Sequence, residues 1–273
     1  MSNLLKRTIF GALYVGVIAV SILLVPSVLP YLAVLVMGAM MHEFYGISLG
    51  DEMKVQRLLS IAAPAILIIL AGSGLAGTKW IWASLLPLMA IVPVQLCGKE
   101  TFKLERLVWV FYGLVWIALP FILFPYIFLR NGEYLGHLLM SFFILIWCSD
   151  IGAYCLGSLL GQRPGAKKLA PSISPHKSWW GVFGGIVLSV AAAVILMFVG
   201  WLEFPLIHTV VLGIIIALAS VVGDLFESLW KRHAGVKDSG NMIPGHGGML
   251  DRLDSSLFAI PLGAVYLILF NLI

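Results

Sequence analysis

The sequence predicts an all-α integral membrane protein that crosses the bilayer about nine times. Of its 273 residues, 61% are hydrophobic and only 11% are charged, and its mean hydropathy is +1.04. Soluble domains carry about 25% charged residues. Apolar runs close to the roughly 20 residues that a membrane-spanning helix needs recur along the whole chain. This composition excludes a water-soluble domain and gives no indication of nucleic-acid binding.

Each apolar run gives one predicted span. The first run follows Lys6 and Arg7 and lacks a cleavage site of small residues, so we interpret it as a retained helix. Several runs contain Pro or Gly, which helix bundles in membranes tolerate. The predicted spans are Thr8–Val25, Val28–Ser48, Leu58–Gly74, Trp80–Leu96, Leu107–Leu129, Leu138–Leu160, Gly181–Leu202, Leu206–Trp230 and Ser256–Ile273.

The distribution of positive charge orients these spans. With the N-terminus in the cytoplasm, all of the 17 Lys and Arg residues except Lys79 and Arg130 fall in cytoplasmic segments. The positive-inside rule expects such a bias. The same topology makes residues 161–180 and 231–255 the two long cytoplasmic loops.

Acidic residues lie inside three of the predicted helices, toward this cytoplasmic side. Glu43 is in the second span, Asp150 in the sixth and Asp224 in the eighth. Because a charge at mid-membrane costs roughly 2.5–3.5 kcal/mol, these acids predict a polar cavity that opens to the cytoplasm. For Glu43, a snorkelling or paired carboxylate at the membrane interface is an open alternative. We expect the chain to divide into two regions. The transmembrane helices of residues 1–130 would form a scaffold and give access to lipid, and residues 131–273 would form the catalytic region.

Charged residues are concentrated between Asp224 and Asp254. At helical spacing one face of the eighth span carries Asp224, Glu227, Ser228 and Lys231. Asp251 and Asp254 are again three residues apart and share a face if the ninth helix begins near them. Clustered Asp side chains supply the hard oxygen ligands that Mg²⁺ prefers, and Mg²⁺ in turn binds substrate phosphates.

A glycine-rich turn lies between these two acidic groups. Its glycines allow a ligand to approach the backbone closely and permit positive φ, and amides at the start of the next helix favour phosphate. His246 in this turn could donate a hydrogen bond to phosphate, or it could have only a structural role in the turn. Cations that could neutralise phosphate flank the turn: Lys231, Arg232, Lys237 and Arg252. Acids for a metal beside cations for phosphates predict phosphoryl or nucleotidyl transfer.

The other long loop combines basic and hydroxyl residues with Pro171 and Pro175. It is not a P-loop, because the spacing of glycines before its lysine is wrong. An ordinary basic loop would account for the lysines but not for the prolines and serines. Trp179 and Trp180 mark the membrane interface at the start of the seventh span.

Two segments carry an ordered series of polar residues. The first is Ser228-x2-Lys231-Arg232-x4-Lys237-Asp238-x-Gly240-x2-Ile243-Pro-Gly-His246-Gly-Gly-Met-x-Asp251-Arg252-Leu-Asp254. The second joins Asp150-x-Gly152-Ala-Tyr-x2-Gly157 to Lys168-Leu-Ala-Pro-x-Ile-Ser174-Pro-x-Lys177-Ser178. Together they resemble the phosphatidate cytidylyltransferase (CDP-diacylglycerol synthase) family. Trp180, Trp230 and a longer link from Gly161 to Lys168 depart from the family pattern without removing a polar position.

The resemblance implies a reaction in phospholipid biosynthesis. CMP would pass from CTP to phosphatidate, giving CDP-diacylglycerol and pyrophosphate with Mg²⁺ as cofactor. It implies metal ligands at Asp224, Asp251 and Asp254. The catalytic set would be completed by Lys231, Arg232 and Arg252. Further substrate contacts would come from Asp150, Lys168, Ser174, Lys177, Ser178, Ser228, Lys237, Asp238, His246, Gly247 and Gly248. The expected partners are CTP, phosphatidate and membrane lipid, at the bacterial inner membrane.

Alternative functions are open at this point. Another CTP-using lipid enzyme, such as a polyprenol or isoprenoid-alcohol kinase or an ether-lipid cytidylyltransferase, would show the same residue types. An ion-coupled transporter could use Asp150 and Asp224 as ion ligands, although the sequence shows no internal repeat of the kind typical of transporters. A second metal ion or monovalent cation, and a homodimer, are also left open.

Overall fold

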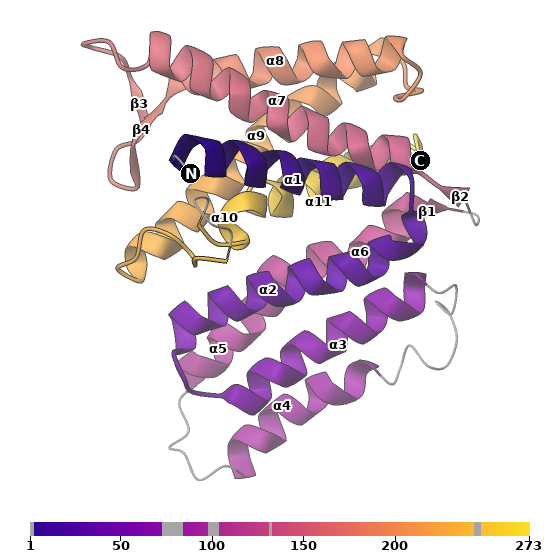
Figure 1. Cartoon of the computed structure of the whole chain (residues 1–273), viewed down its shortest axis with the longest axis vertical. Helices are drawn as coiled ribbons and strands as arrows, with labels where there is room; N and C mark the ends of the chain where they lie inside the picture. The colour runs from indigo at the N-terminus through magenta and orange to yellow at the C-terminus, as the bar shows by residue number, and fades with distance from the viewer. Residues whose placement is uncertain (1–2, 73–83, 98–103, 131–132, 243–246) are drawn as a thin grey trace. The chain divides into compact units, whose positions relative to one another are not determined.

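The structure, a computed structural model, describes residues 3–72, 84–97, 104–130, 133–242 and 247–273. In these ranges each predicted span coincides with a helical segment (Figure 1). Seven helical segments of the described chain are long and apolar enough to cross a membrane, and Gly11–Leu23 and Leu85–Leu96 are shorter apolar helices. The chain is therefore a multi-pass, almost entirely α-helical membrane protein. The count of nine spans, the cytoplasmic N-terminus and the cytoplasmic cavity stay predictions.

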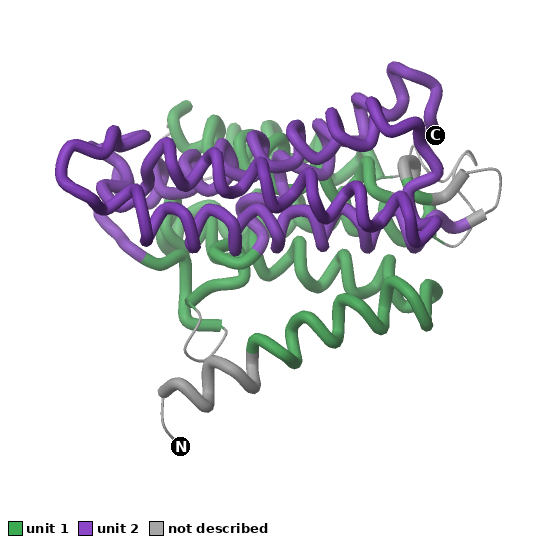
Figure 2. The backbone as a smooth tube through the Cα atoms, turned by 90° about the horizontal axis from the view of Figure 1, so that it is seen from above, with its two compact units in different colours: residues 1–132, 238–252 green, residues 133–237, 253–273 purple. Residues whose placement is uncertain are grey.

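The chain divides into two compact units, coloured separately in Figure 2. Unit 1 comprises Met1–Gly132 and Asp238–Arg252, and unit 2 comprises Glu133–Lys237 and Leu253–Ile273. The segment Asp238–Arg252 therefore folds with the N-terminal helices, although in the sequence it lies between the two stretches of unit 2.

Unit 1 is built around α2. Its helices are α1 (Asn3–Leu23), η1 (Pro26–Val28), α2 (Leu29–Leu49), α3 (Lys54–Gly72), α4 (Leu85–Cys97), α5 (Leu104–Gly113), the π-helical turn η3 (Leu114–Ala118) and α6 (Leu119–Phe128), followed by the short strand β1 (Leu129–Arg130). Helix α2 packs on α3 and α5, and α3 packs on α4. Met37, Phe44 and Tyr45 of α2 are fully buried, and the Tyr45 hydroxyl donates to the Val110 carbonyl at 2.8 Å. This contact ties α2 to α5.

Unit 2 is a bundle of long helices, of which α7 and α8 pack closely where both carry glycine. Its elements are β2 (Glu133–Tyr134), α7 (Gly136–Leu159), β3 (Lys168–Ala170), β4 (Ser174–Ser178), α8 (Trp179–Phe198), α9 (Leu206–His233) and α11 (Ser256–Leu269), and the short α10 (Leu250–Leu253) contains the boundary between the units. A Cβ on Gly152 of α7 would lie 2.2 Å from the Gly184 carbonyl oxygen of α8. The two backbones can approach this closely only because both residues are glycines.

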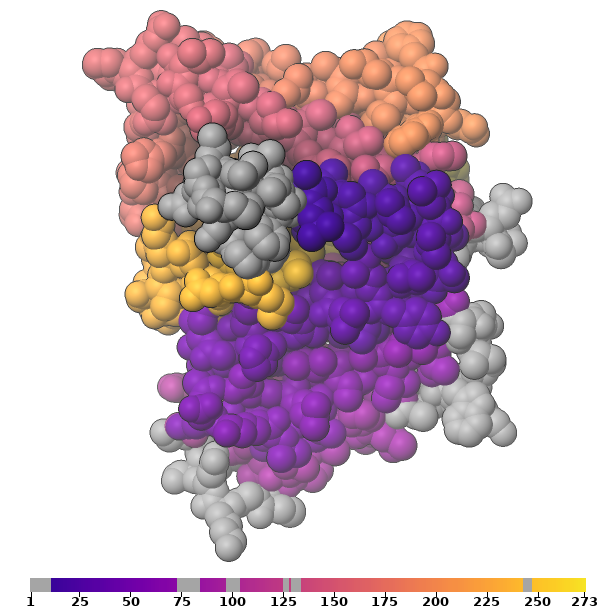
Figure 3. All heavy atoms as spheres, in the orientation of Figure 1, coloured from indigo at the N-terminus to yellow at the C-terminus, as the bar shows by residue number. Residues whose placement is uncertain are grey.

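A β-hairpin stands where the sequence predicted only a loop. Strands β3 and β4 pair antiparallel, with Lys168 opposite Ser178 and Ala170 opposite Ser174. The Lys168 Nζ donates to the Gly161 carbonyl at 2.8 Å and holds the base of the hairpin. The hairpin lies on the visible surface in Figure 3, at the same end of unit 2 as the C-terminal part of α9 (Figure 1).

Candidate active site

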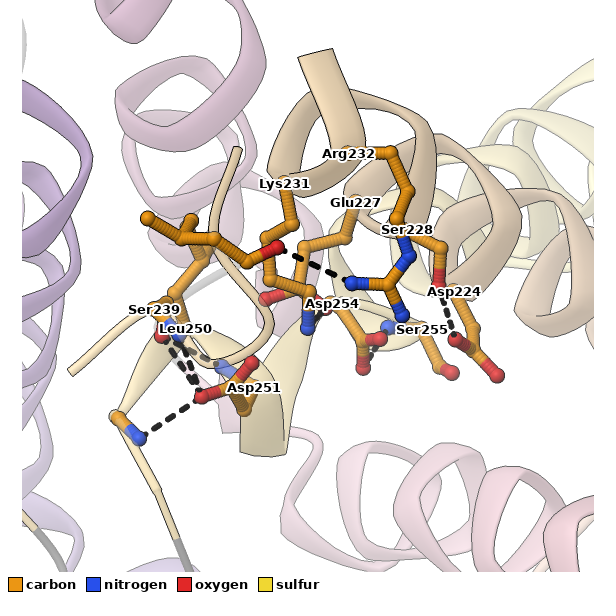
Figure 4. A network of polar contacts seen from close by, with 12 residues as sticks. Asp224, Glu227, Ser228, Lys231, Arg232, Ser239, Leu250, Asp251, Asp254 and Ser255 are labelled. Atoms are coloured by element: carbon orange, nitrogen blue, oxygen red, sulfur yellow. Dashed lines mark hydrogen bonds and ion pairs between the residues drawn. The ribbon is translucent and has the colours of Figure 1, made fainter. Parts of the chain in front are cut away.

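The C-terminal end of α9 carries the polar cluster of unit 2 (Figure 4). The Ser228 hydroxyl donates to Asp224 Oδ1 at 3.4 Å. One turn further along, the Lys231 Nζ donates to Glu227 Oε2 at 2.6 Å, and the Glu227 side chain is only 1% exposed. These two pairs confirm the face that the helical spacing predicted.

Strand β4 adds a cation to this cluster. The Lys177 Nζ lies 2.5 Å from Asp224 Oδ2, and the two side chains are 23% and 43% exposed. The Asp224 side chain is therefore partly open to solvent, whereas the Lys177 Nζ atom itself is buried. The ion pair joins a residue of the second polar segment to Asp224, which precedes the first; the sequence predicted a role for each residue but not their contact.

Asp254 lies deeper in unit 2. It is 8% exposed, and its Oδ1 accepts the Ser255 amide at 2.7 Å. A Cβ on Gly223 would lie 2.5 Å from the Asp254 carbonyl oxygen, so this glycine allows α9 to approach the Asp254 backbone closely. The carboxylates of Asp150, Asp224 and Glu227 are near enough to act electrostatically on Asp254.

These carboxylates have the donor chemistry that a divalent cation requires, since Mg²⁺ prefers oxygen ligands. In the described part of the chain, no three His, Cys, Asp or Glu side chains are gathered so as to hold a metal ion as they stand. Asp224 is engaged by Lys177, so a bound cation would compete with that ammonium group for the carboxylate. Asp224 and Asp254 thus fit a metal by chemical type, and the metal itself stays a proposal.

Asp251 belongs to a polar cluster within unit 1. Its Oδ2 accepts the Gly248 amide at 2.8 Å, and the Ser239 amide and hydroxyl at 2.9 Å each. The Asp251 carboxylate is therefore fixed by the segment that precedes it.

Glu43 of α2 lies in the same cluster. Its Oε1 accepts the Met249 amide at 2.9 Å, and its Oε2 accepts the Leu250 amide at 2.9 Å and contacts the Ser239 hydroxyl at 3.2 Å. With only 7% of its surface exposed, Glu43 is a paired, buried carboxylate. Of the two alternatives for Glu43, the structure favours a paired carboxylate over a direct ligand role.

The glycine turn is described only from Gly247 onward, and His246 lies outside the described residues. Gly247 has a φ of +84°, which confirms the need for glycine there. Gly248 has a different reason, because an added Cβ would lie 2.5 Å from Glu43 Oε2. The close approach that the sequence predicted at Gly248 is thus made by a protein carboxylate.

Some of the other predicted site residues make hydrogen bonds within the local structure, and others are exposed. Ser178 is buried, and its Oγ accepts the Gly181 amide at 3.2 Å, which caps α8. The Arg232 Nη1 donates to the Val236 carbonyl at 3.0 Å, while Lys237 and Asp238 are exposed. The remaining ones are Lys168 and Ser174 in the hairpin, and Arg252, whose carbonyl accepts the Tyr14 hydroxyl at 3.4 Å.

Sequence reasoning left Glu43, Glu227 and Ser239 out of the site. The spacing of Glu227 to Lys231 did place the two residues on one helix face, and the same signal predicts their ion pair. No local signal exists for Glu43, because its amide partners lie more than 200 residues away in the sequence.

Comparisons with known proteins bear on the whole chain. The sequence model described as "Cytidylyltransferase family" matches residues 5–270. The phosphatidate cytidylyltransferase of Bacillus subtilis (strain 168) is 32% identical over 254 residues, which are 85% of this chain and 88% of that protein. That of Staphylococcus haemolyticus (strain JCSC1435) is 29% identical over 89% of this chain and 95% of its own length. That of Haemophilus influenzae (strain ATCC 51907 / DSM 11121 / KW20 / Rd) is 45% identical over 45% of this chain and 43% of its own length. The chain therefore belongs to the cytidylyltransferase family of nucleotidyltransferases.

Proposed function

We propose that this protein transfers CMP from CTP to phosphatidate in the bacterial inner membrane, with Mg²⁺ as cofactor. The relatives that match most of the chain are named phosphatidate cytidylyltransferases. The structural observation that carries the proposal is the contact of Lys177 with Asp224 at the end of an apolar bundle. A partly exposed carboxylate that holds a buried ammonium group suits the charged phosphates of a water-soluble nucleotide, while the surrounding helices suit a lipid.

The proposed reaction is a displacement at phosphorus. A phosphate oxygen of phosphatidate forms a bond to the α-phosphorus of CTP. The bond from that phosphorus to the bridging α,β-oxygen breaks, and its electron pair leaves with pyrophosphate. The attacking phosphate is already anionic at neutral pH, so no general base is required. Catalysis then depends on positioning the phosphates and stabilising their charge.

Lys177, Lys231 and Arg232 are the cations that we assign to the phosphates. Each has a partner in the protein before substrate binds, namely Asp224, Glu227 and the Val236 carbonyl. These contacts hold the cations near the end of α9 without substrate. Arg252 is assigned to phosphate from the sequence pattern alone.

For Mg²⁺ we propose the ligands Asp224 and Asp254 of unit 2, with Asp251 proposed from the sequence pattern. When bound, Mg²⁺ would offset negative charge on the phosphates and on these carboxylates. Asp254 is buried beside other carboxylates, and a cation would lower their mutual repulsion. Phosphatidate would reach the site from the bilayer, between the helices, and CTP would reach it from the aqueous phase.

The test uses purified protein in detergent micelles that contain phosphatidate. CTP carries ³²P at the α-phosphate in one reaction and at the γ-phosphate in the other. We expect labelled lipid only from the α-label, no label when diacylglycerol replaces phosphatidate, and loss of product with EDTA that added Mg²⁺ restores. Lipid labelled from the γ-position would instead identify a CTP-dependent lipid kinase. Absence of labelled lipid together with ion-coupled uptake in vesicles would identify a transporter.

A further inference from the structure

We propose that Glu43, on α2, is a positioning residue for the nucleotidyl transfer. It holds the turn from Gly248 to Asp251, and so fixes the backbone from which the Asp251 carboxylate projects. This inference rests on the proposed function, because it assigns to that reaction a residue that lies outside both polar segments of the sequence.

The first support is the number of backbone donors that converge on carboxylates in this turn. The amides of Met249 and Leu250 both donate to Glu43, at 2.9 Å each. The preceding amide, of Gly248, donates to Asp251 Oδ2 at 2.8 Å. Three consecutive amides are therefore held by two carboxylates, and two of the three by a side chain from another helix.

The second support is the fit of the backbone around Glu43. A Cβ on Gly240 would lie 2.7 Å from Glu43 Oε1, and one on Gly248 would lie 2.5 Å from Oε2. Cβ atoms in proteins essentially never come this close to a non-bonded heavy atom. The chain thus has glycine at both points where its backbone passes the Glu43 carboxylate. A larger residue at either point would occupy the space that this carboxylate fills.

The third support is the connection from Glu43 to Asp251 through Ser239. The Ser239 Oγ lies 3.2 Å from Glu43 Oε2 and 2.9 Å from Asp251 Oδ2, and it accepts the Asp251 amide at 3.3 Å. The hydroxyl has one hydrogen, so it donates to one carboxylate at a time. A change at Glu43 therefore alters the hydrogen bonding of Asp251 directly.

The alternative is that Glu43 only stabilises the folded chain. The substitution Glu43→Gln separates the two roles because both carboxylate oxygens accept amide hydrogens. In either orientation the new NH₂ group faces a backbone N–H, so one hydrogen bond becomes a repulsive contact while the side-chain volume is kept. Glu43→Asp keeps the charge but shortens the side chain by one methylene.

The experiment measures turnover and local protection on the same purified, full-length proteins. For Glu43→Gln we expect kcat to fall by about 10- to 100-fold, the order that a misplacement near 1 Å causes, with the KM for phosphatidate within about twofold. Amide hydrogen exchange, measured without substrate or metal, should become faster in residues 247–253. Glu43→Asp should give intermediate values of both quantities.

The matched control is Gln56→Leu. Gln56 is also buried in unit 1, where its Nε2 donates to Gln95 Oε1 at 2.8 Å and joins α3 to α4. This variant should lower thermal stability while kcat per folded molecule and exchange in residues 247–253 stay at wild-type values.

The outcomes separate this inference from the proposed function. Wild-type kcat in Glu43→Gln, or a loss that matches only the loss of folded protein, would overturn the positioning role. Unchanged exchange in residues 247–253 would overturn it as well. If wild-type protein failed to convert CTP and phosphatidate, the proposed function would fail and Glu43 would have no role in that reaction. Faster exchange confined to this turn in Glu43→Gln would then show only that Glu43 holds the turn.

Discussion

The ion pair between Glu227 and Lys231 leads to a quantitative prediction about stability. Its charged atoms are 2.6 Å apart, and the side chains are 1% and 11% exposed. At an effective dielectric constant of about 20, unit charges at this distance attract by about 6 kcal/mol, much of which offsets the loss of hydration. Removing one partner of a buried pair costs about 3–5 kcal/mol, because the other charge is left buried. Since Lys231 keeps some access to solvent, we expect about 3 kcal/mol for Glu227→Gln.

The assay is a double-mutant cycle with Glu227→Gln, Lys231→Met and the double variant. Each protein is unfolded in micelles with increasing dodecyl sulfate and followed by circular dichroism. Because the double variant removes both charges of this pair and leaves neither buried without the other, it should recover most of the lost stability. The coupling free energy should therefore be about 3 kcal/mol, at the upper end of values for residues in contact.

Two results would contradict this reasoning. If the double variant lost the sum of the single losses, with coupling below about 0.5 kcal/mol, the two charges would not depend on each other. If the double variant were as active as the wild type, Lys231 would not bind phosphate in the reaction. Recovered stability without recovered turnover is the expected combination.

The remaining predictions concern other contacts of unit 2. Asp254→Asn should abolish turnover while the protein still elutes as a folded species in gel filtration, and full activity would remove this residue from the metal site. Lys177→Met should raise the KM for CTP about tenfold and tighten Mg²⁺ binding to the substrate-free protein in calorimetry, because a competitor for the Asp224 carboxylate is gone. Gly152→Ala should destabilise the protein by about 1–3 kcal/mol through overpacking against α8. The matched Gly46→Ala, with nothing within 4 Å of the new carbon, should not.

Helix positions could be predicted from the sequence because a chain in a bilayer must satisfy its backbone hydrogen bonds internally. The predicted span Leu138–Leu160 is α7 at Gly136–Leu159, and the predicted span Leu206–Trp230 is α9 at Leu206–His233. The hairpin of β3 and β4 could not be predicted, because its strands are only three and five residues long.

The candidate site was predictable where its contacts are local. Asp224, Ser228 and Lys231 share a helix face, so the sequence spacing alone places them together. The contact of Lys177 with Asp224 depends on how the hairpin meets α9, which no pattern of residues encodes. Ser178 has the residue type of a substrate ligand, but a serine just before a helix is also a typical N-cap, and the structure shows that contact.

Gly248 shows why residue type is a weaker guide to function than the contact that requires it. In a glycine-rich turn beside acids and cations, a glycine suggests a place where phosphate meets the backbone. In the structure an added Cβ would instead lie 2.1 Å from Ser239 Oγ and 2.5 Å from Glu43 Oε2. The residue is thus required by two contacts, one with Ser239 in the same polar segment and one with α2, which lies outside the polar segments. The glycines of the polar segment and Glu43 of the N-terminal helices therefore fit each other, and the position of Asp251 depends on both.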